Sequence, residues 1–341
     1  MNATADPAAP TARSDAPARS SVDSAGHRRF WLEGGSALSP SSVKVDLPDA
    51  CVDELDALLA RHPGDGGARD LQGRLHEARE GGALAGALGA NAALAREVRE
   101  RLAHAPGAVL VDRFPAERWS DEQNRSACGL FSALVGPLME QDFTGTLLYD
   151  VMDKRVGDTT GVRRSITNLD QRLHTDGGWE AEPARYIGLY CIRAASSGGH
   201  SLLTSLLAAR DALRAEGRED VLLTLSRELP WDRQGEHAEG ERTWAPNPVF
   251  VEDEHGFLAR FYESYVRDGY AERGDPVPPE VDEALALLAE RLDAQPRIRF
   301  MLEAGQYQYV NNYTLVHARE SFDDPGGDPV RGRRLIRVWH R

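Results

Sequence analysis

Short β-strand patterns recur along residues 43–339, and they restrict the fold of this chain more than any other feature of the sequence. The runs are apolar or alternating, and Gly, Pro or polar residues bound them, as is typical of strands and turns. The segment 201–204 is expected to pair with 186–194 as a hairpin. About eight strands without an internal repeat fit a sandwich or barrel of sheets. We expect strands at 43–48, 108–114, 146–152, 186–194, 201–204, 249–261 (a hairpin turning near His255), 297–303, 307–316 and 333–339.

Helical patterns lie before and between these strands, with apolar residues at helical spacing. The sequence therefore predicts a mainly β fold with helices (α+β). We expect a single domain over residues 29–341, with a helical N-terminal part and inserted helices around 206–227 and 279–294. The expected helices are 49–61, the second half of 80–105, 121–135 behind an N-cap at Ser120, 206–227 as one helix or a pair, and 279–294.

Three segments lack a core-forming pattern. Residues 1–28 are rich in Ala, Pro, Ser and Asp, and this composition predicts a disordered tail. Residues 153–170 are polar and contain Gly157 and Gly161, so we expect a loop that closes over a site. Residues 229–247 are rich in Trp, Pro, Glu and Gly and are also expected to form a loop.

The charge of the chain excludes several classes of partner. Its 341 residues carry 54 Asp and Glu against 40 Lys and Arg, a formal net charge of −14. Nucleic-acid-binding proteins usually present a basic surface, so we expect a small-molecule partner and neither nucleic acid nor an anionic membrane. No apolar run of about 18 residues or apolar leader is present, which predicts a cytoplasmic location. The three cysteines are too widely spaced for a disulfide framework, and a homodimer is compatible with the sequence.

Two histidines and one aspartate form the first candidate site. On a strand, His174 and Asp176 would point to the same face, because strand side chains alternate. Alone, such a triplet is common, and Asp176 could instead cap the glycine turn that follows. His317 closes an alternating strand, where a structural role is more usual. Together, however, the three form the two-histidine, one-carboxylate set of non-haem iron(II) oxygenases, which leaves metal positions open for a 2-oxo acid and dioxygen.

A basic cluster near residue 340 forms the second candidate site, because it contrasts with an acidic chain. Arg333 and Arg337 lie four residues apart and hence on one face of a strand. An arginine binds a carboxylate through two parallel hydrogen bonds. A solvated surface position is the preferred interpretation for Arg334 and Arg341.

These motifs, in this order, resemble the TauD/TfdA family of iron(II)/2-oxoglutarate dioxygenases, which includes the clavaminate-synthase-like enzymes. The resemblance extends over roughly residues 105–341. It implies a double-stranded β-helix (jelly-roll) core with helices packed outside. The motifs are His174-Thr-Asp176, the strand 186–192, Gly198-Gly199-His200-Ser201, Gly305-x5-Asn311-Asn312-x4-His317-x-Arg319 and Arg333-x3-Arg337.

The resemblance also implies roles for individual residues. His174, Asp176 and His317 would bind Fe(II). Arg333 and Ser201 would bind the distal carboxylate of 2-oxoglutarate, and Arg337 would contact 2-oxoglutarate or the substrate. His317 and Arg333 are 16 residues apart, somewhat more than is usual in the family, so Arg331 and Arg334 remain alternatives to Arg333.

The implied reaction is hydroxylation of an unactivated C–H bond of a small polar metabolite, an amino acid or derivative, in biosynthesis. Fe(II), 2-oxoglutarate and O2 would be required, and Asp176 favours hydroxylation over halogenation. Desaturation, epoxidation, cyclisation, an inactive small-molecule-binding jelly roll and a zinc hydrolase remain alternatives, although the arginine pair favours a 2-oxo acid. The candidate substrate contacts are Arg172, Trp179, Glu180, Arg260, Tyr262 and Asn311.

Overall fold

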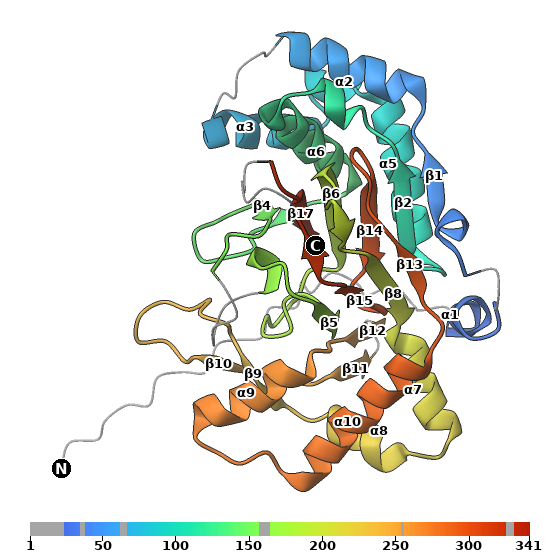
Figure 1. The fold of residues 1–341 in the computed structure, drawn as a ribbon, viewed down its shortest axis with the longest axis vertical. Coiled ribbons are helices and arrows are strands. Elements are labelled where there is room, and N and C mark those ends of the chain that lie inside the picture. The colour runs from blue at the N-terminus through green and yellow to red at the C-terminus, as the bar shows by residue number, and fades with distance from the viewer. Residues whose placement is uncertain (1–23, 35–37, 62–66, 157–163, 254–255, 325–330) are drawn as a thin grey trace.

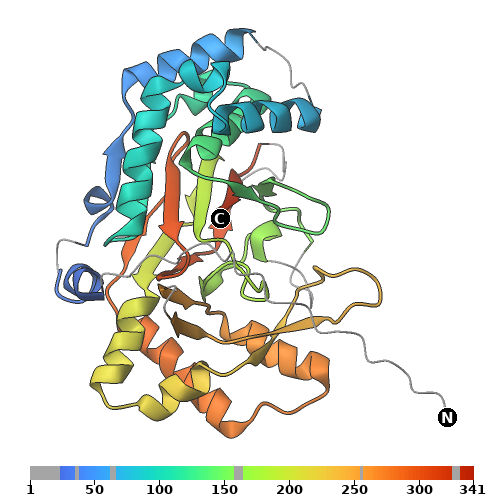
Figure 2. The same cartoon turned by 180° about the vertical axis from the view of Figure 1, so that it is seen from behind.

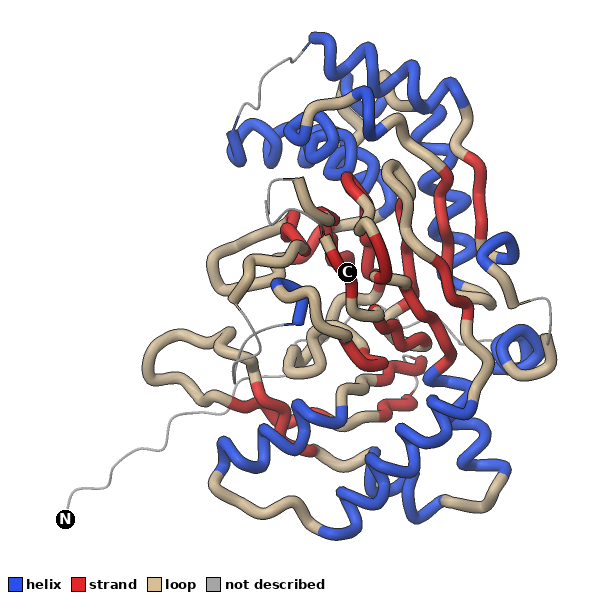
Figure 3. Tube along the Cα trace, viewed as in Figure 1, coloured by secondary structure: helices blue, strands red, loops and turns tan. Residues whose placement is uncertain are grey.

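Two β-sheets lie face to face in the computed structural model, and helices cover their outer faces (Figure 1). Most helices gather at two opposite ends of the molecule, with the strands between them (Figure 3). This is the jelly-roll core with helical buttresses that the sequence predicts. The structure describes residues 24–34, 38–61, 67–156, 164–253, 256–324 and 331–341.

The larger sheet has seven strands in the order β1-β2-β14-β6-β17-β3, and β4 also pairs with β17. β1 and β2 are parallel, whereas the other neighbours are antiparallel. β17 therefore lies inside the sheet, with β6 on one side and β3 and β4 on the other. The strands are β1 (Lys44–Asp46), β2 (Ala108–Asp112), β3 (Leu138–Met139), β4 (Leu148–Val151), β6 (Tyr186–Arg193), β14 (Tyr307–Asn311) and β17 (Arg334–His340).

The smaller sheet has four antiparallel strands in the order β13-β8-β15-β5. Its members are β13 (Ile298–Phe300), β8 (Ser201–Ser205), β15 (Leu315–Arg319) and β5 (Gln171–His174). Three short antiparallel pairs accompany the two sheets. They are β9 (Leu229–Asp232) with β10 (Trp244–Asn247), β11 (Phe250–Asp253) with β12 (Gly256–Ala259), and β7 (Ser197–Gly198) with β16 (Phe322–Asp323).

Apart from α1, which lies at the side of the molecule, the described helices fall into two groups, one on each sheet (Figure 2). Helices α2, α3, α5 and α6 pack on the outer face of the larger sheet, whereas α7 to α10 pack on the outer face of the smaller one. The helices are α1 (Ser24–Trp31), α2 (Asp49–Arg61), α3 (Gly67–Arg79), α4 (Ala83–Gly86), α5 (Gly89–Ala103), α6 (Asp121–Val135), α7 (Leu206–Ala215), α8 (Glu219–Leu225), α9 (Glu263–Arg273) and α10 (Pro279–Ala294).

Alternation along β17 divides its side chains between two environments. Leu335 and Trp339 pack in the core between the sheets. Ile336 and Val338 pack in the other core, beneath the helices of the larger sheet. Arg337 lies between Ile336 and Val338 in sequence, so its side chain enters the space between the sheets.

The chain crosses from one sheet to the other at two points that the sequence did not predict. One was expected to be a hairpin and the other a single strand. The expected hairpin of 186–194 with 201–204 is wrong, because β6 belongs to the larger sheet and β8 to the smaller one. The segment 307–316 is likewise two strands, β14 and β15, in different sheets. His317 consequently lies in the middle of β15 and does not close a strand. Every residue of β14 and β15 is buried, so alternation could not reveal the crossing.

The expected helices at 49–61, 121–135 and 279–294 are confirmed. Ser120 caps α6 and forms a capping box with Gln123.

Other boundaries differ from the predictions. Residues 24–28, which the composition placed in a disordered tail, belong to α1, and residues 1–23 lie outside the described residues. The segment 229–247 contains β9 and β10 and is not wholly a loop. Residues 157–163 of the predicted lid also lie outside the described residues. Within the described parts of the chain, none of the helices has the length and apolar character needed to cross a bilayer.

The imidazole of His340 should make stability depend on pH. The side chain is completely buried, and this burial lowers its pKa from 6.5 to about 4. Between these values the unfolded chain binds a proton that the folded chain does not. The free energy of unfolding should therefore fall by roughly 3 kcal/mol as the pH falls through this window. Denaturant titrations should show a steeper fall in the wild type than in His340→Leu, which keeps the contribution of the buried His317, and equal slopes would contradict the prediction.

Candidate metal centre

Strand pairing brings two histidines together. In the antiparallel pair of β5 and β15, the Cα atom of His317 lies opposite that of His174. Residues opposite each other in such a pair present their side chains on the same face. The two imidazole ring centroids are accordingly 4.2 Å apart.

Asp176 completes the group from just beyond the end of β5. Its Oδ1 atom is 3.5 Å from Nε2 of His174 and 3.9 Å from Nε2 of His317. All three side chains are buried, and one potential ligand atom from each lies within 4.8 Å of the others. The sequence placed His174 and Asp176 on one strand; the structure ends the strand at His174, and a turn carries Asp176 to the same point.

The protonation of these groups suits a divalent metal. Nδ1 of His174 lies 2.8 Å from the carbonyl oxygen of Arg172, to which it can only donate, so Nε2 keeps its lone pair for a ligand. Burial, with the adjacent His174, lowers the pKa of His317 to about 3, and its imidazole is therefore neutral. Burial alone would raise the pKa of Asp176, but Arg337 and the two histidines hold it well below its usual range. Two imidazoles and one carboxylate fit the donor set of non-haem iron(II).

Hydrogen bonds fix Asp176 on both its backbone and its side chain. The Asp176 N–H donates to Oδ1 of Asn312 at 2.9 Å, and Nδ2 of Asn312 donates to the Asp176 carbonyl at 3.0 Å. Oδ2 of Asp176 accepts from the indole of Trp339 at 2.8 Å and lies 3.2 Å from Nη1 of Arg337. Sequence reasoning assigned no role to Trp339. Its position two residues after Arg337 on the same strand face was the available signal.

The neighbouring arginines Arg333 and Arg334 have different environments. Arg334 faces outward and pairs with Asp121 at 2.6 Å and with Asp150 at 2.8 Å. Arg333 is only 5% exposed, its guanidinium lies 5.0 Å from the ring centroid of Phe322, and its Nη1 has no hydrogen-bond partner among the described residues. Burial lowers the pKa of Arg333 to about 10, so it remains charged at neutral pH. A buried cation of this kind can bind an incoming anion.

Arg337 is held from several sides. Its Nε donates to Oε1 of Gln141 at 2.8 Å, and Nε2 of Gln141 donates back to the carbonyl of Arg337 at 2.8 Å. The guanidinium lies 4.9 Å from the ring centroid of Tyr149 and 5.1 Å from that of Trp339. Its orientation toward Asp176 is therefore fixed before any ligand binds.

Ser201 lies on the face of β8 that points toward the metal centre. Leu203 is opposite His317 in the sheet register, and Ser201, two residues earlier, presents its buried side chain to the same side. The turn before it requires glycine: Gly198 has a φ of +72°, and a Cβ atom there would lie 2.3 Å from the carbonyl oxygen of Ser321.

Two of the six predicted substrate contacts lie close to the metal centre. Trp179 lines the pocket around His174 and Asp176, together with Gln171 and Tyr265. The ring centroid of Tyr262 is 5.2 Å from that of His174.

The other four predicted contacts have different neighbours. Arg260 donates to the backbone carbonyls of Glu180 and Ala181. Asn311 donates to the carbonyl of Leu102. Arg172 is exposed and pairs with Glu263 at 3.3 Å. The Glu180 carboxyl hydrogen-bonds the side chain of Trp179, which lines the metal pocket, and burial raises the pKa of this carboxyl.

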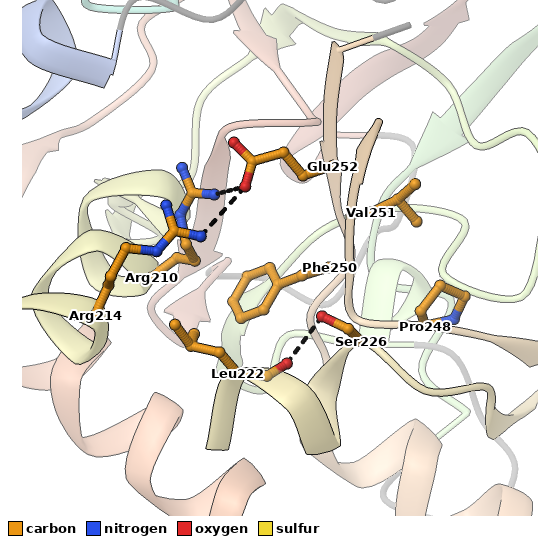
Figure 4. Close-up of a pocket in the computed structure, with 8 residues that line it drawn as sticks. All are labelled: Arg210, Arg214, Leu222, Ser226, Pro248, Phe250, Val251 and Glu252. Atoms are coloured by element: carbon orange, nitrogen blue, oxygen red, sulfur yellow. Dashed lines mark hydrogen bonds and ion pairs between the residues drawn. The ribbon is translucent and has the colours of Figure 1, made fainter. Parts of the chain in front are cut away.

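A second pocket, of about 290 Å³, lies apart from this group, between α7, α8 and β11 (Figure 4). Its two arginines, Arg210 and Arg214, both contact Glu252, at 2.6 and 3.3 Å. Arg210 also pairs with Asp211 at 2.7 Å, so both arginines have carboxylate partners, whereas Nη1 of Arg333 has no hydrogen-bond partner among the described residues.

The family model of the taurine catabolism dioxygenase TauD, TfdA family matches residues 69–339. The chain belongs to this family. Similar solved structures include an asparagine oxygenase, with a TM-score of 0.64 and 18% identity, covering 87% of this chain and 93% of that one. The non-haem iron oxygenase OrfP, solved with Fe and alpha-ketoglutaric acid, also gives a TM-score of 0.64, at 16% identity and with the same coverage. At these identities the likeness concerns the fold.

Curated relatives of this TauD-family chain match over shorter segments. A taurine hydroxylase-like protein of Stachybotrys chartarum is 32% identical over 170 residues, which are 49% of this chain and 41% of that protein. A uridine-5'-phosphate dioxygenase of a Streptomyces species is 35% identical over 182 residues, 51% of this chain and 62% of that protein. The chain thus spans about half the length of the curated relatives that it matches.

Removal of one ligand should abolish metal binding. His174→Ala should weaken Fe(II) binding by more than about 100-fold, because loss of even an outer partner of a ligand typically costs 10- to 100-fold. An anaerobic titration with Fe(II) measures this. His200→Ala is the matched control, since His200 pairs with Glu320 and is not part of the ligand group. Equal affinity of the two variants would contradict the assignment.

Proposed function

We propose that this chain is an iron(II)/2-oxoglutarate-dependent dioxygenase that hydroxylates a C–H bond of a small polar metabolite. The observation that carries the proposal is the combination, in one jelly-roll core, of a buried His–Asp–His group with a buried arginine whose Nη1 has no hydrogen-bond partner among the described residues. Family membership supports it. A homodimer and a cytoplasmic location remain predictions from the sequence.

His174, Asp176 and His317 would hold the iron through Nε2, Oδ1 and Nε2. Iron(II) and 2-oxoglutarate, when bound, supply the means to use dioxygen for C–H oxidation, and 2-oxoglutarate leaves as succinate and carbon dioxide. The chain contributes orientation and the exclusion of water. All three ligand residues are at most 7% exposed, which supports a water-poor centre.

Arg333 would bind the distal carboxylate of 2-oxoglutarate. A carboxylate there would offset the cost of burying a cation and would satisfy Nη1, which lacks a partner within the described part of the chain. Ser201 would add a hydrogen bond from its face of β8. The outward pairing of Arg334 with two aspartates favours Arg333 over that alternative. A zinc hydrolase would have no comparable use for this arginine.

The substrate would approach from the side of Trp179, Tyr265 and Gln171, which line the metal pocket. Arg337 would offer positive charge to an anionic group of the substrate or of 2-oxoglutarate. An amino acid or derivative is the proposed substrate class. Two similar structures support it, since the asparagine oxygenase was solved with 3-hydroxyasparagine and OrfP with L-Arg. The nucleotide-oxidising relatives make a phosphorylated metabolite the second candidate.

Anaerobic visible spectroscopy with Fe(II) and 2-oxoglutarate tests the proposal. The complex should give a weak metal-to-ligand charge-transfer band that is absent from His174→Ala. Succinate release on addition of oxygen and candidate substrates then measures turnover. Absence of the band from fully metallated wild-type protein would reject the dioxygenase assignment and favour a zinc or binding-only role.

Single replacements of two adjacent arginines should have opposite effects on 2-oxoglutarate binding and on the free energy of unfolding. Arg333→Leu should raise the dissociation constant of 2-oxoglutarate by about 100-fold, through loss of a charged hydrogen-bonded pair. It should not lower the free energy of unfolding, because it removes a charge that is costly to bury. Arg334→Leu should leave 2-oxoglutarate binding intact and cost about 1 kcal/mol of stability from its partly exposed ion pairs. Equilibrium binding and denaturant titration measure both, and the reverse pattern would refute the assignment of Arg333.

A further inference from the structure

The two oxygens of the Asp176 carboxylate have different partners. Oδ1 faces the Nε2 atoms of both histidines, at 3.5 and 3.9 Å. Oδ2 points away from them and accepts the Trp339 indole N–H at 2.8 Å, with Nη1 of Arg337 at 3.2 Å. The side chains on β17 therefore distinguish one oxygen from the other.

We propose that Trp339 is a positioning residue, whose indole N–H holds Asp176 so that only Oδ1 binds the metal. The proposal rests on the iron-dependent function above. A carboxylate can bind a cation through one oxygen or through both. Binding through both would occupy a position that a 2-oxo acid or dioxygen needs on a metal with three protein ligands. An oxygen already bound to an indole N–H and a guanidinium is not available for this.

The indole is itself rigidly placed. Trp339 is 2% exposed, and its neighbours across the sheet are Met139 on one side and Ile187 on the other. Its ring packs on the turn after Asp176, where a Cβ atom at Gly177 would lie 3.3 Å from the ring. Gly177 has a φ of +68°, which favours glycine at this position. The ring thus supports both the carboxylate and the turn that carries it.

Trp231, on β9, provides a matched control, because its ring packs on the same turn. It is 1% exposed, and a Cβ atom at Gly178 would lie 2.5 Å from its ring. Its indole N–H donates to the carbonyl of Asn247 at 2.9 Å and not to a metal ligand. Replacement of either tryptophan by phenylalanine removes one buried indole hydrogen bond beside adjacent glycines, but only one replacement frees Oδ2 of Asp176.

Anaerobic Fe(II) titration of the wild type, Trp339→Phe and Trp231→Phe tests the proposal. Trp339→Phe should weaken Fe(II) binding by roughly 10- to 100-fold, as is usual when the hydrogen-bond partner of a metal ligand is lost. Trp231→Phe should leave the Fe(II) dissociation constant unchanged. Trp339→Phe should also shift the charge-transfer band of the Fe(II)–2-oxoglutarate complex, because the coordination by Asp176 changes.

The outcomes separate the two proposals. If the wild type binds Fe(II) and both variants bind it equally well, or both lose affinity to the same extent, Trp339 has only a structural role and the inference is overturned. If the wild type itself fails to bind Fe(II), the proposed function is the part that fails. Should Trp339→Phe not fold, site-specific replacement of Trp339 by its benzothiophene analogue keeps the ring and removes the N–H. Unchanged affinity there would likewise overturn the inference.

Discussion

The register between β5 and β15, which sets His317 opposite His174, is the constraint on which the rest of the site depends. A slip of one residue would turn either imidazole to the outer face of the sheet, beneath α7 to α10. Asp176 lies outside both strands and takes its position from Asn312, which donates to its carbonyl and accepts from its N–H. Asn312 lies in the turn between β14 and β15, so the crossing that joins the sheets also fixes the carboxylate.

Electrostatic pairing divides the two inward-facing arginines into different roles. Arg337 lies 3.2 Å from a carboxylate and is bound to Gln141, so its charge is largely balanced inside the protein. Arg333 has no such carboxylate at its Nη1 among the described residues, and its burial is costly until an anion arrives. An anion that binds at Arg333 would therefore offset the cost of burying this charge. Arg337, in contrast, orders the carboxylate of Asp176.

The sequence predicted which side chains gather at the site better than the path of the chain. The His–Asp–His group could be selected from residue type and order, and the structure brings the three side chains together. The roles of the arginines stay predictions. The sequence could not show that 186–194 and 201–204 belong to different sheets, because strands that are buried on both faces have the same apolar pattern in either sheet. Helix α9 was missed because only Val266, Gly269 and Tyr270 are buried along it, which gives a weak periodic pattern. The roles of Trp339, Asn312 and Gln141 depend on partners between about 130 and 200 residues away, a separation that no local motif encodes.

The position of β17 has a consequence for biosynthesis. This strand is the last in the sequence, yet it lies inside the larger sheet between β6 and the β3–β4 edge. Translation therefore delivers His174, Asp176 and His317 before the donors that orient Asp176. Until β17 inserts, the edge of β6 that faces away from β14 is unpaired, and Asp176 lacks its two side-chain donors from β17. Completion of the sheet thus brings the Trp339 and Arg337 donors to the Asp176 carboxylate.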